Sequence, residues 1–174
     1  YFILKKRPGY PQIIREIFNS LITMGVFVSL NACVGYTTLA QDPSALVIVL
    51  HFMGLIVAHD TYFYWTHRLI HQPFLYRPIH RIHHLSVNTT PFTSYSFSLG
   101  ESMITALFLL IATHTFECSQ TSVIFFIFFS YLFNVIGHLG YEFYPKQWVR
   151  YQLSTTTTHH ALHHRSYRYN FGLY

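Results

Sequence analysis

Long apolar segments constrain the fold of this chain more than any other feature of its sequence. Four of them stand out, at about 17–39, 44–71, 99–116 and 122–139. A helix needs about 20 residues to cross the hydrocarbon core of a bilayer, so the first two segments are long enough and the last two are short. We therefore expect an all-α integral membrane protein with about four transmembrane helices.

The positions of the basic residues indicate how the four segments are oriented in the membrane. The chain has no Lys or Arg between Arg15 and Arg68, and none between Arg81 and Lys146. Four spans would place every basic residue on the same side of the membrane, and the positive-inside rule makes that side cytosolic. The two short turns on the other side carry acidic residues as their only charges.

Composition excludes several other classes of protein. Only 10% of the 174 residues are charged, whereas soluble domains average about 25%. The net charge of +5 is dispersed among apolar segments and forms no basic face that could follow a nucleic-acid backbone, so we expect no nucleic-acid partner. Cys33 and Cys118 are too isolated for a disulfide framework or a thiolate metal site. The basic N-terminal residues lack the short apolar region of a cleavable signal peptide.

The second apolar segment is longer than a bilayer requires. Residues 44–71 would form a helix of about 42 Å at about 1.5 Å per residue, against about 30 Å of hydrocarbon. Its last turns should therefore emerge on the cytosolic side. The first cluster of histidines lies at this end of the segment.

Three histidine clusters read HRLIH (67–71), HRIHH (80–84) and HHALHH (159–164). Residues three and four apart share one face of a helix. The first cluster has histidines at i and i+4, and the second at i, i+3 and i+4. The last three histidines of the third cluster repeat the pattern of the second. Each cluster is thus predicted to form a short helical stripe of imidazoles.

A fourth polar element lies near the end of the last apolar segment. Asn134, His138 and Glu142 are spaced by four and are predicted to line one side of the fourth helix. Asp60, seven residues before His67, shares the face of the first stripe. Acidic residues in or near a membrane are costly unless paired, so we expect them to orient ligand imidazoles, with helix-end or packing roles as the alternative. The candidate supporting residues are Asp60, Glu101, Asn134 and Glu142.

This number of aligned imidazoles indicates a metal site. Neutral imidazole suits iron, zinc, copper and nickel, and a tetrahedral zinc ion takes at most four ligands. Eight or nine histidines suit two ions with five or six ligands each, which favours iron and oxygen chemistry, although zinc could fill such a site. His159 is either a ligand or a neighbour that supports one. The candidate ligands are His67, His71, His80, His83, His84, His138, His159, His160, His163 and His164.

The remaining histidines and the aromatic run have simpler interpretations. His51, His59 and His114 stand alone in apolar sequence, where a packed or hydrogen-bonded histidine is more common than a ligand. The run VIFFIFFSYLF (123–133) is expected to face lipid and neighbouring helices. A substrate groove along this run is the alternative.

The clusters resemble the histidine boxes of the fatty acid hydroxylase/sterol desaturase superfamily of integral-membrane di-iron oxygenases. HDTYFYWTHRLIH (59–71) is similar to the first box, and RPIHRIHHLSVNTTPFTSY (77–95) to the second box with its tail. GHLGYE, and THHALHH followed by NFGLY, are similar to the third region. The TPFTSY stretch favours the sterol C5-desaturase-like branch.

The resemblance implies a single membrane domain over 1–174, with a first span at about 17–39 and a histidine-box catalytic region at about 59–174. It also implies two iron ions, with zinc as a substitute in purified protein, and O2 as co-substrate. No catalytic residue beyond the metal centre is implied. Because family members usually continue further, we expect the chain to be a fragment or to be truncated at its C terminus.

The implied reaction is hydroxylation or desaturation of an unactivated C–H bond in a membrane lipid of sterol or fatty acyl type. No flavin, nicotinamide or haem motif is visible, so the electrons would come from cytochrome b5, a ferredoxin or a reductase. The implied location is the endoplasmic reticulum or a bacterial inner membrane, with the histidines on the cytosolic side. Substrate, reaction outcome and oligomeric state stay open.

Two other classes of function compete with this hypothesis. A non-catalytic zinc-binding or metal-transport membrane protein would also gather histidines, but transport predicts more polar residues along the spans. A histidine-based hydrolase would need a nucleophile motif such as GxSxG, and the sequence contains none.

Overall fold

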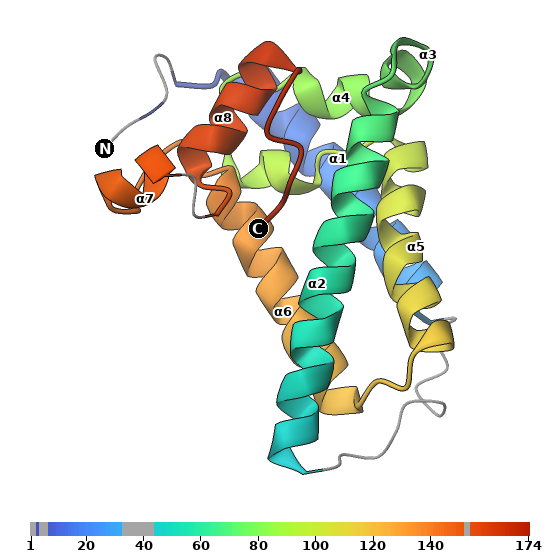
Figure 1. Ribbon diagram of the computed structural model, residues 1–174. Helices are drawn as coiled ribbons and strands as arrows, with labels where there is room; N and C mark the ends of the chain where they lie inside the picture. Colours follow the sequence, from blue (N-terminus) through green and yellow to red (C-terminus); the bar gives the residue numbers. More distant parts are fainter. Residues whose placement is uncertain (1–2, 4–6, 33–43, 152–153) are drawn as a thin grey trace.

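The computed structural model describes residues 3, 7–32, 44–151 and 154–174, and these residues form helices and no strands. Four long helices make up the body of the molecule (Figure 1). They are α1 (Tyr10–Ala32), α2 (Ala45–Ile70), α5 (Leu99–Thr115) and α6 (Gln120–Gly137). The shorter elements are α3 (Pro73–Leu75), the π-helical turn η2 (Tyr76–His80), α4 (Arg81–His84), the 3₁₀ turn η3 (Pro91–Tyr95), α7 (Lys146–Tyr151) and α8 (Thr157–Ser166).

The long helices follow the predicted apolar segments, with one shift. Helices α2, α5 and α6 match the predicted segments to within two residues at each end. Helix α1 begins at Tyr10, earlier than the predicted start near residue 17. Pro11 lies in its first turn, where the fixed φ of proline favours helix entry, and the helix buries the charged Glu16. The end of the first predicted segment, 33–39, and most of the predicted turn at 41–44 lie outside the described residues.

Three of these helices are long and apolar enough to cross a membrane, namely α1, α2 and α6. Helix α5 has 17 residues, about 26 Å at 1.5 Å per residue, which is less than the hydrocarbon thickness of about 30 Å. The predicted class, an all-α membrane protein, is therefore confirmed. The predicted number of four spans is not.

The four long helices pack in pairs. Helix α1 packs against α5, and α2 packs against α6 and α5. At one end of the bundle lie α3, α4 and α8, and the connection between α5 and α6 lies at the other (Figure 1). The segment after α8 runs back between α2 and α6, so the last described residues lie inside the bundle.

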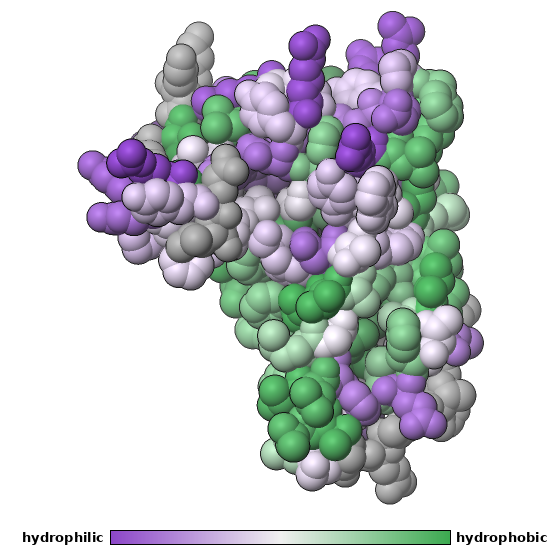
Figure 2. Space-filling view, viewed as in Figure 1, coloured by the Kyte–Doolittle hydropathy of each residue, from purple (hydrophilic) through white to green (hydrophobic). Residues whose placement is uncertain are grey.

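Hydrophobic and hydrophilic surfaces lie at different ends of the bundle. In Figure 2 the end formed by the lower halves of the long helices is mainly hydrophobic, whereas hydrophilic residues gather over the end that carries α4 and α8 and over α7. Many large apolar side chains on the long helices are exposed, among them Phe125 and Phe128 of α6 at 56% and 68%. Lipid would cover such a surface, as predicted for one face of the aromatic run.

Glu16 ties α1 to the turn that follows α4. Its side chain is fully buried. Its carboxylate accepts hydrogen bonds from Gln12 Nε2 at 2.7 Å, Thr93 Oγ1 at 3.0 Å and Thr90 Oγ1 at 2.5 Å. A buried carboxylate is tolerated when its oxygens are hydrogen-bonded in this way. The residues after the second histidine cluster are thereby fixed to the bundle.

The prediction that Glu142 continues the helical face of Asn134 and His138 is wrong. Helix α6 ends at Gly137, and Gly140 has a φ of 67°, a left-handed conformation that glycine adopts without steric cost. Beyond this turn the Glu142 carboxylate accepts hydrogen bonds from the backbone N–H groups of Tyr144 at 3.0 Å and Thr158 at 2.9 Å. Glu142 thus holds the first turn of α8, where the helix dipole favours a negative charge.

Candidate metal centre

Nine of the ten predicted ligands lie together at the polar end of the bundle. They form two groups, and within each group the potential ligand atoms lie within 4.8 Å of one another. The first histidine group is His67, His71, His80, His84 and His163. The second histidine group is His83, His138, His160 and His164.

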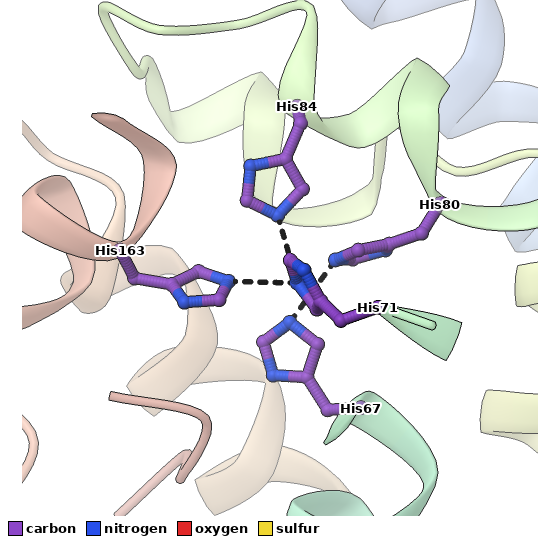
Figure 3. Close-up of side chains that lie close together, drawn as sticks. All are labelled: His67, His71, His80, His84 and His163. Carbon is purple, nitrogen blue, oxygen red and sulfur yellow. Dashed lines mark hydrogen bonds between the residues drawn. The ribbon is translucent and has the colours of Figure 1, made fainter. Parts of the chain in front are cut away.

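The first group combines residues from three parts of the chain. The last turn of α2 and its C-cap supply His67 and His71, the turn η2 and helix α4 supply His80 and His84, and α8 supplies His163. Their rings point toward one another around His71 (Figure 3). The Nε2 atoms of His71 and His163 are 3.1 Å apart, and those of His67 and His80 are 3.0 Å apart.

The second group uses α4, the end of α6 and α8. His83 comes from α4, His138 is the C-cap of α6, and His160 and His164 lie one turn apart on α8. The Nε2 atoms of His160 and His138 are 2.9 Å apart, and those of His164 and His160 are 3.2 Å apart. As predicted, the i, i+3, i+4 spacing turns the rings of each cluster inward.

The two groups are direct neighbours. Because His83 and His84 are consecutive, as are His163 and His164, each pair places one ring in each group. The ring centroids of His84 and His164, which belong to different groups, are 4.7 Å apart. Two ions bound here would therefore share one buried space.

Backbone carbonyl groups fix the protonation of three rings. The Nδ1 atoms of His67, His163 and His138 lie 2.9, 2.7 and 2.7 Å from the carbonyl oxygens of Phe171, Tyr169 and Asn134. A carbonyl oxygen only accepts hydrogen bonds, so each Nδ1 must carry the proton. In each neutral ring the Nε2 lone pair therefore points into its histidine group.

Glu101 plays the same part for a fourth ring. Its Oε1 lies 2.7 Å from Nδ1 of His80, and both side chains are buried. The other oxygen, Oε2, is buried without a hydrogen-bond partner among the described residues. A carboxylate behind a ligand imidazole fixes the ring orientation and raises its basicity. The structure thus brings Glu101 to the place predicted for a supporting residue.

These donor sets fit metal ions. The Nδ1 protons of His67 and His163 are bonded to backbone carbonyl groups, so the Nε2 lone pairs of both rings point into the first histidine group. Lone pairs that face one another repel, and a cation bound between them relieves this repulsion. Five and four nitrogen donors suit iron, zinc, copper or nickel rather than magnesium or calcium. The residues present can therefore hold two transition-metal ions.

Burial keeps these imidazoles ready to bind metal. Desolvation lowers the pKa of His71 to about 3, with a further contribution from His163, and lowers the pKa of both His138 and His163 to about 4. Burial, followed by neighbouring histidines, also lowers the pKa of His84 and His160. At neutral pH the rings are uncharged, which is the form that coordinates metal.

His159 lies apart from both groups, which corrects the prediction that it is a ligand. Its Nε2 lies 3.0 Å from the carbonyl oxygen of Val149, and its Nδ1 accepts a long hydrogen bond of 3.4 Å from the N–H of Thr156. Both ring nitrogens are thereby occupied by backbone groups. On α8 the His159 side chain points in a different direction from those of His160 and His163. It therefore caps the start of the helix and contacts the segment before it.

The other predicted supporting residues act on the backbone. Oδ1 of Asp60 accepts hydrogen bonds from the N–H groups of Leu173 and Tyr174, both at 3.3 Å, and contacts no ligand imidazole. Asn134 donates from Nδ2 to the carbonyl oxygen of Ser94 at 2.9 Å, and only its backbone carbonyl reaches His138. The side chains of both residues therefore position chain segments instead of ligand rings.

Two of the isolated histidines have no role at either group, as predicted. His51 accepts a hydrogen bond from the N–H of Ser119 at 3.2 Å, and the exposed His114 bonds the carbonyl oxygen of Leu110 at 2.8 Å. His59 is different, because it lines two pockets inside the bundle. The spacing of the histidines gave no indication of this position.

The two pockets connect the histidines to the apolar bundle. The histidine-lined pocket contacts His67, His80, His83, His138 and His160. The apolar pocket lies between α1, α2, α5 and α6 and includes Phe126 and Tyr131 of the aromatic run. The residues shared by both pockets are His59, Phe63, Phe97, Thr105 and Asn134.

Sequence reasoning missed the segment after α8. Tyr169 and Phe171 support ligand rings through their carbonyl groups, which any residue type provides. Tyr174 contacts His59, more than a hundred positions earlier in the sequence. These contacts depend on tertiary structure, and only the NFGLY stretch of the family resemblance hinted at them.

Apolar helices with two adjacent histidine groups at one end define a class of metal-binding membrane proteins. The family model described as fatty acid hydroxylase matches residues 52–174. The chain belongs to this family, which confirms the resemblance stated above.

The relatives include proteins named as an aldehyde decarbonylase and as a sterol desaturase. The chain is 32% identical to "Protein CER1-like 2" of Arabidopsis thaliana over 99% of its own length and 30% of the relative. It is 32% identical to "Very-long-chain aldehyde decarbonylase GL1-7" of Oryza sativa subsp. japonica over 75% of its length and 22% of the relative. It is 27% identical to "Delta(7)-sterol 5(6)-desaturase" of Leptosphaeria maculans over 79% of its length and 37% of the relative.

These relatives include the sterol desaturase branch that the TPFTSY stretch favours. The chain spans about 30% of the length of the CER1-like protein it matches. No solved structure matches it.

Proposed function

We propose that the chain is the catalytic part of an O2-dependent di-iron oxidoreductase that hydroxylates or desaturates a membrane lipid. Residues 59–174 would form the catalytic region of one membrane domain. The observation that carries this proposal is the pair of adjacent histidine groups, which open toward an apolar pocket inside a lipid-facing bundle.

Iron fits the donor count better than zinc does. Nine inward-facing imidazoles are one more than two four-coordinate structural zinc ions would take. Two ions with four or five protein ligands each keep open positions, as a redox site that handles O2 requires. Zinc would occupy the same nitrogens in protein purified without iron.

When bound, the two iron ions would supply the reduction of O2 and the cleavage of an unactivated C–H bond. Hydroxylation converts the lipid, O2, two electrons and two protons into an alcohol and water. The chain contributes fixed ligand rings through Glu101 and the carbonyl groups of Tyr169 and Phe171. It also keeps bulk water away, since His80, His83 and His164 are nearly or fully buried. Binding, orientation and exclusion of water are what a protein adds to a reactive cofactor.

The electrons must come from an external donor such as cytochrome b5, a ferredoxin or a reductase. Hydrophilic residues cover the end of the molecule that holds the histidines (Figure 2). The sequence places its basic residues on the same side of the spans, so this end would face the cytosol. An acidic electron carrier would be attracted to such a surface. The membrane would be the endoplasmic reticulum or a bacterial inner membrane.

The names of the relatives support a lipid as substrate. One relative is named for an aldehyde of very long chain and another for a sterol, and the substrates share a large apolar part with a small oxygen function. The apolar pocket is lined by Phe27, Phe108, Phe126 and other apolar residues. It would hold the apolar carbon atoms nearest the reacting bond.

The competing function is that of a non-catalytic metal-binding or metal-transport protein. Such a protein would bind zinc stoichiometrically and consume no O2. The pocket beside the histidines favours catalysis over this alternative, because the space next to the metal site is lined by apolar side chains such as Phe63 and Phe97.

The test measures iron content and O2-dependent lipid product in purified membranes that carry the protein and a reductase system. The wild type should hold about two iron ions per chain and form product. His83→Ala, which removes a ligand of the second group, should lose iron and activity. His114→Ala changes an exposed histidine and is the matched control. Unchanged iron and activity in His83→Ala, or iron-loaded wild-type protein that consumes no O2, would contradict the proposal.

A further inference from the structure

His59 is a buried polar side chain that the metal site does not use. It lies on α2, eight residues and therefore about two turns before His67, and it is 7% exposed. Its ring is surrounded by aromatic side chains, with centroid distances of 4.7 Å to Phe108 and 5.1 Å to Phe126. A polar group in such surroundings costs free energy unless it is hydrogen-bonded.

Only one nitrogen of this ring is bonded within the protein. Nδ1 of His59 lies 2.9 Å from the hydroxyl of Tyr174. Nε2 has no partner among the described residues, and it is not among the fully buried polar atoms. Since His59 lines both the apolar and the histidine-lined pocket, this nitrogen is available where the two pockets meet.

The Tyr174 hydroxyl is held in place by the surrounding chain. Asp60 Oδ1 accepts hydrogen bonds from the backbone N–H groups of Leu173 and Tyr174. The ring of Tyr174 packs against Phe129 at 5.4 Å and Phe133 at 5.1 Å. The hydroxyl can donate to Nδ1 or accept from it, so Nε2 can present either a proton or a lone pair. His59 can therefore bind a carbonyl oxygen as a donor and a hydroxyl group as an acceptor.

The two pockets suit an uncharged oxygen function at His59. Neither pocket is lined by a Lys or Arg. A neutral alcohol or aldehyde needs only one hydrogen bond.

We propose that His59, oriented by Tyr174, binds the neutral oxygen function of a long-chain alcohol or aldehyde, and that this contact selects such lipids over hydrocarbons. This inference rests on the proposed function, because it takes the molecule in the pocket to be the lipid substrate. His59 acts as a specificity residue, and the apolar pocket takes the carbon atoms next to the oxygen function.

The test measures binding without turnover. The protein is loaded with zinc in lipid nanodiscs, and binding is measured for a long-chain primary alcohol and for the aldehyde and the alkane of the same chain length. Wild-type protein should bind the alcohol and the aldehyde roughly tenfold more tightly than the alkane, the size expected for one buried hydrogen bond.

Variants separate the hydrogen bond from the shape of the pocket. His59→Phe should bind the alcohol, the aldehyde and the alkane equally, with alkane affinity unchanged. His59→Gln keeps a donor and an acceptor and should keep part of the preference. Tyr174→Phe retains the ring but removes the hydroxyl, and should weaken the preference without loss of metal. His114→Phe is the control and should match wild type.

Two results would overturn the inference, namely wild-type protein that binds the alkane as tightly as the alcohol, and His59→Phe that retains the preference. If His59→Phe does not fold, as judged by lost metal, then His59→Gln and Tyr174→Phe decide the question. Turnover with iron is measured separately. Selective binding without any O2-dependent product would disprove the proposed function and leave the binding site in place.

Discussion

Single backbone carbonyl groups decide which nitrogen of a histidine faces into its histidine group. The carbonyl oxygens of Tyr169, Phe171 and Asn134 each accept a hydrogen bond from a protonated Nδ1 atom, and this leaves Nε2 as the atom that could bind a metal ion. Glu101 is the one side chain among the described residues that does this for a ligand ring. A substitution does not remove a backbone carbonyl group. Glu101 is therefore the main residue through which the support of the histidine rings can be tested by mutation.

Glu101→Ala should weaken metal binding about 10- to 100-fold, the usual effect of removing a group that orients a ligand. The His80 ring would lose its acceptor and could rotate or change tautomer. Glu101→Gln retains an oxygen acceptor and should lose less. The measurement is a competitive zinc titration of the purified protein. Equal affinity of Glu101→Ala and wild type would contradict this role.

His159 and His163 provide a matched pair on one helix. His163→Ala removes a ligand of the first group and should reduce the metal content by about one ion per chain. His159→Ala should keep both ions but lower the free energy of unfolding by about 1–3 kcal/mol, because a buried hydrogen-bonded ring is lost. Metal analysis and thermal unfolding of both variants test this. Loss of metal in His159→Ala would restore the original prediction.

At the scale of elements, the segment after α8 supports the first histidine group more than the second. Tyr169 and Phe171 bond to His163 and His67, both of the first group, whereas the second group takes its carbonyl contact from Asn134 on α6. Asp60 anchors the end of this segment. The two groups therefore differ in which part of the chain keeps them ordered.

Asp60→Ala should release the segment and selectively weaken the first group. We expect faster amide hydrogen exchange at Leu173 and Tyr174, and a drop in affinity for one of two bound ions. Asp60→Asn retains an oxygen acceptor and should have a smaller effect. A cobalt titration followed by absorbance resolves the two ions, and equal weakening of both would argue against this division.

The sequence predicted much of this architecture because the chemistry repeats at helical spacing. Apolar length located α2, α5 and α6. The i, i+3, i+4 pattern found six of the nine grouped histidines, and a spacing of four found His67, His71 and His138. The spacing of four did not place Glu142 correctly, because α6 ends at Gly137 and a left-handed turn at Gly140 follows. It also could not place Asp60 or Tyr174, whose partners lie far away in sequence and follow from tertiary packing.

At the scale of the whole molecule, the candidate metal site lies where four segments of the chain meet. Both groups draw on α4 and α8, and α2 and α6 each contribute to one group. Metal bound to such a site stabilises the folded state only, by about 4.1 kcal/mol when free metal is 1,000 times its Kd. Removal of metal by a chelator should lower Tm by roughly 8–16 °C for a chain of this size. An unchanged Tm would show that the histidines do not bind metal tightly.

The metal-free protein should also be sensitive to acid. The pKa of His138 falls from about 6.5 to about 4 on burial, so the unfolded chain binds more protons than the folded chain as pH drops through this window. Stability is therefore highest above about pH 6.5 and declines below it, by about 2 kcal/mol for His138 alone near pH 5. Thermal unfolding of the metal-free protein at about pH 7.5 and 5 checks this. The variant His138→Phe should lose part of the dependence.

The distribution of ligands along the chain sets the order of events during biosynthesis. Each histidine group takes at least one ligand from α8, and α8 follows every apolar helix in the sequence. The complete ligand set of either group therefore exists only after α1, α2, α5 and α6 have been synthesised. If the histidines hold a redox-active ion, a fully ligated site would form after these helices.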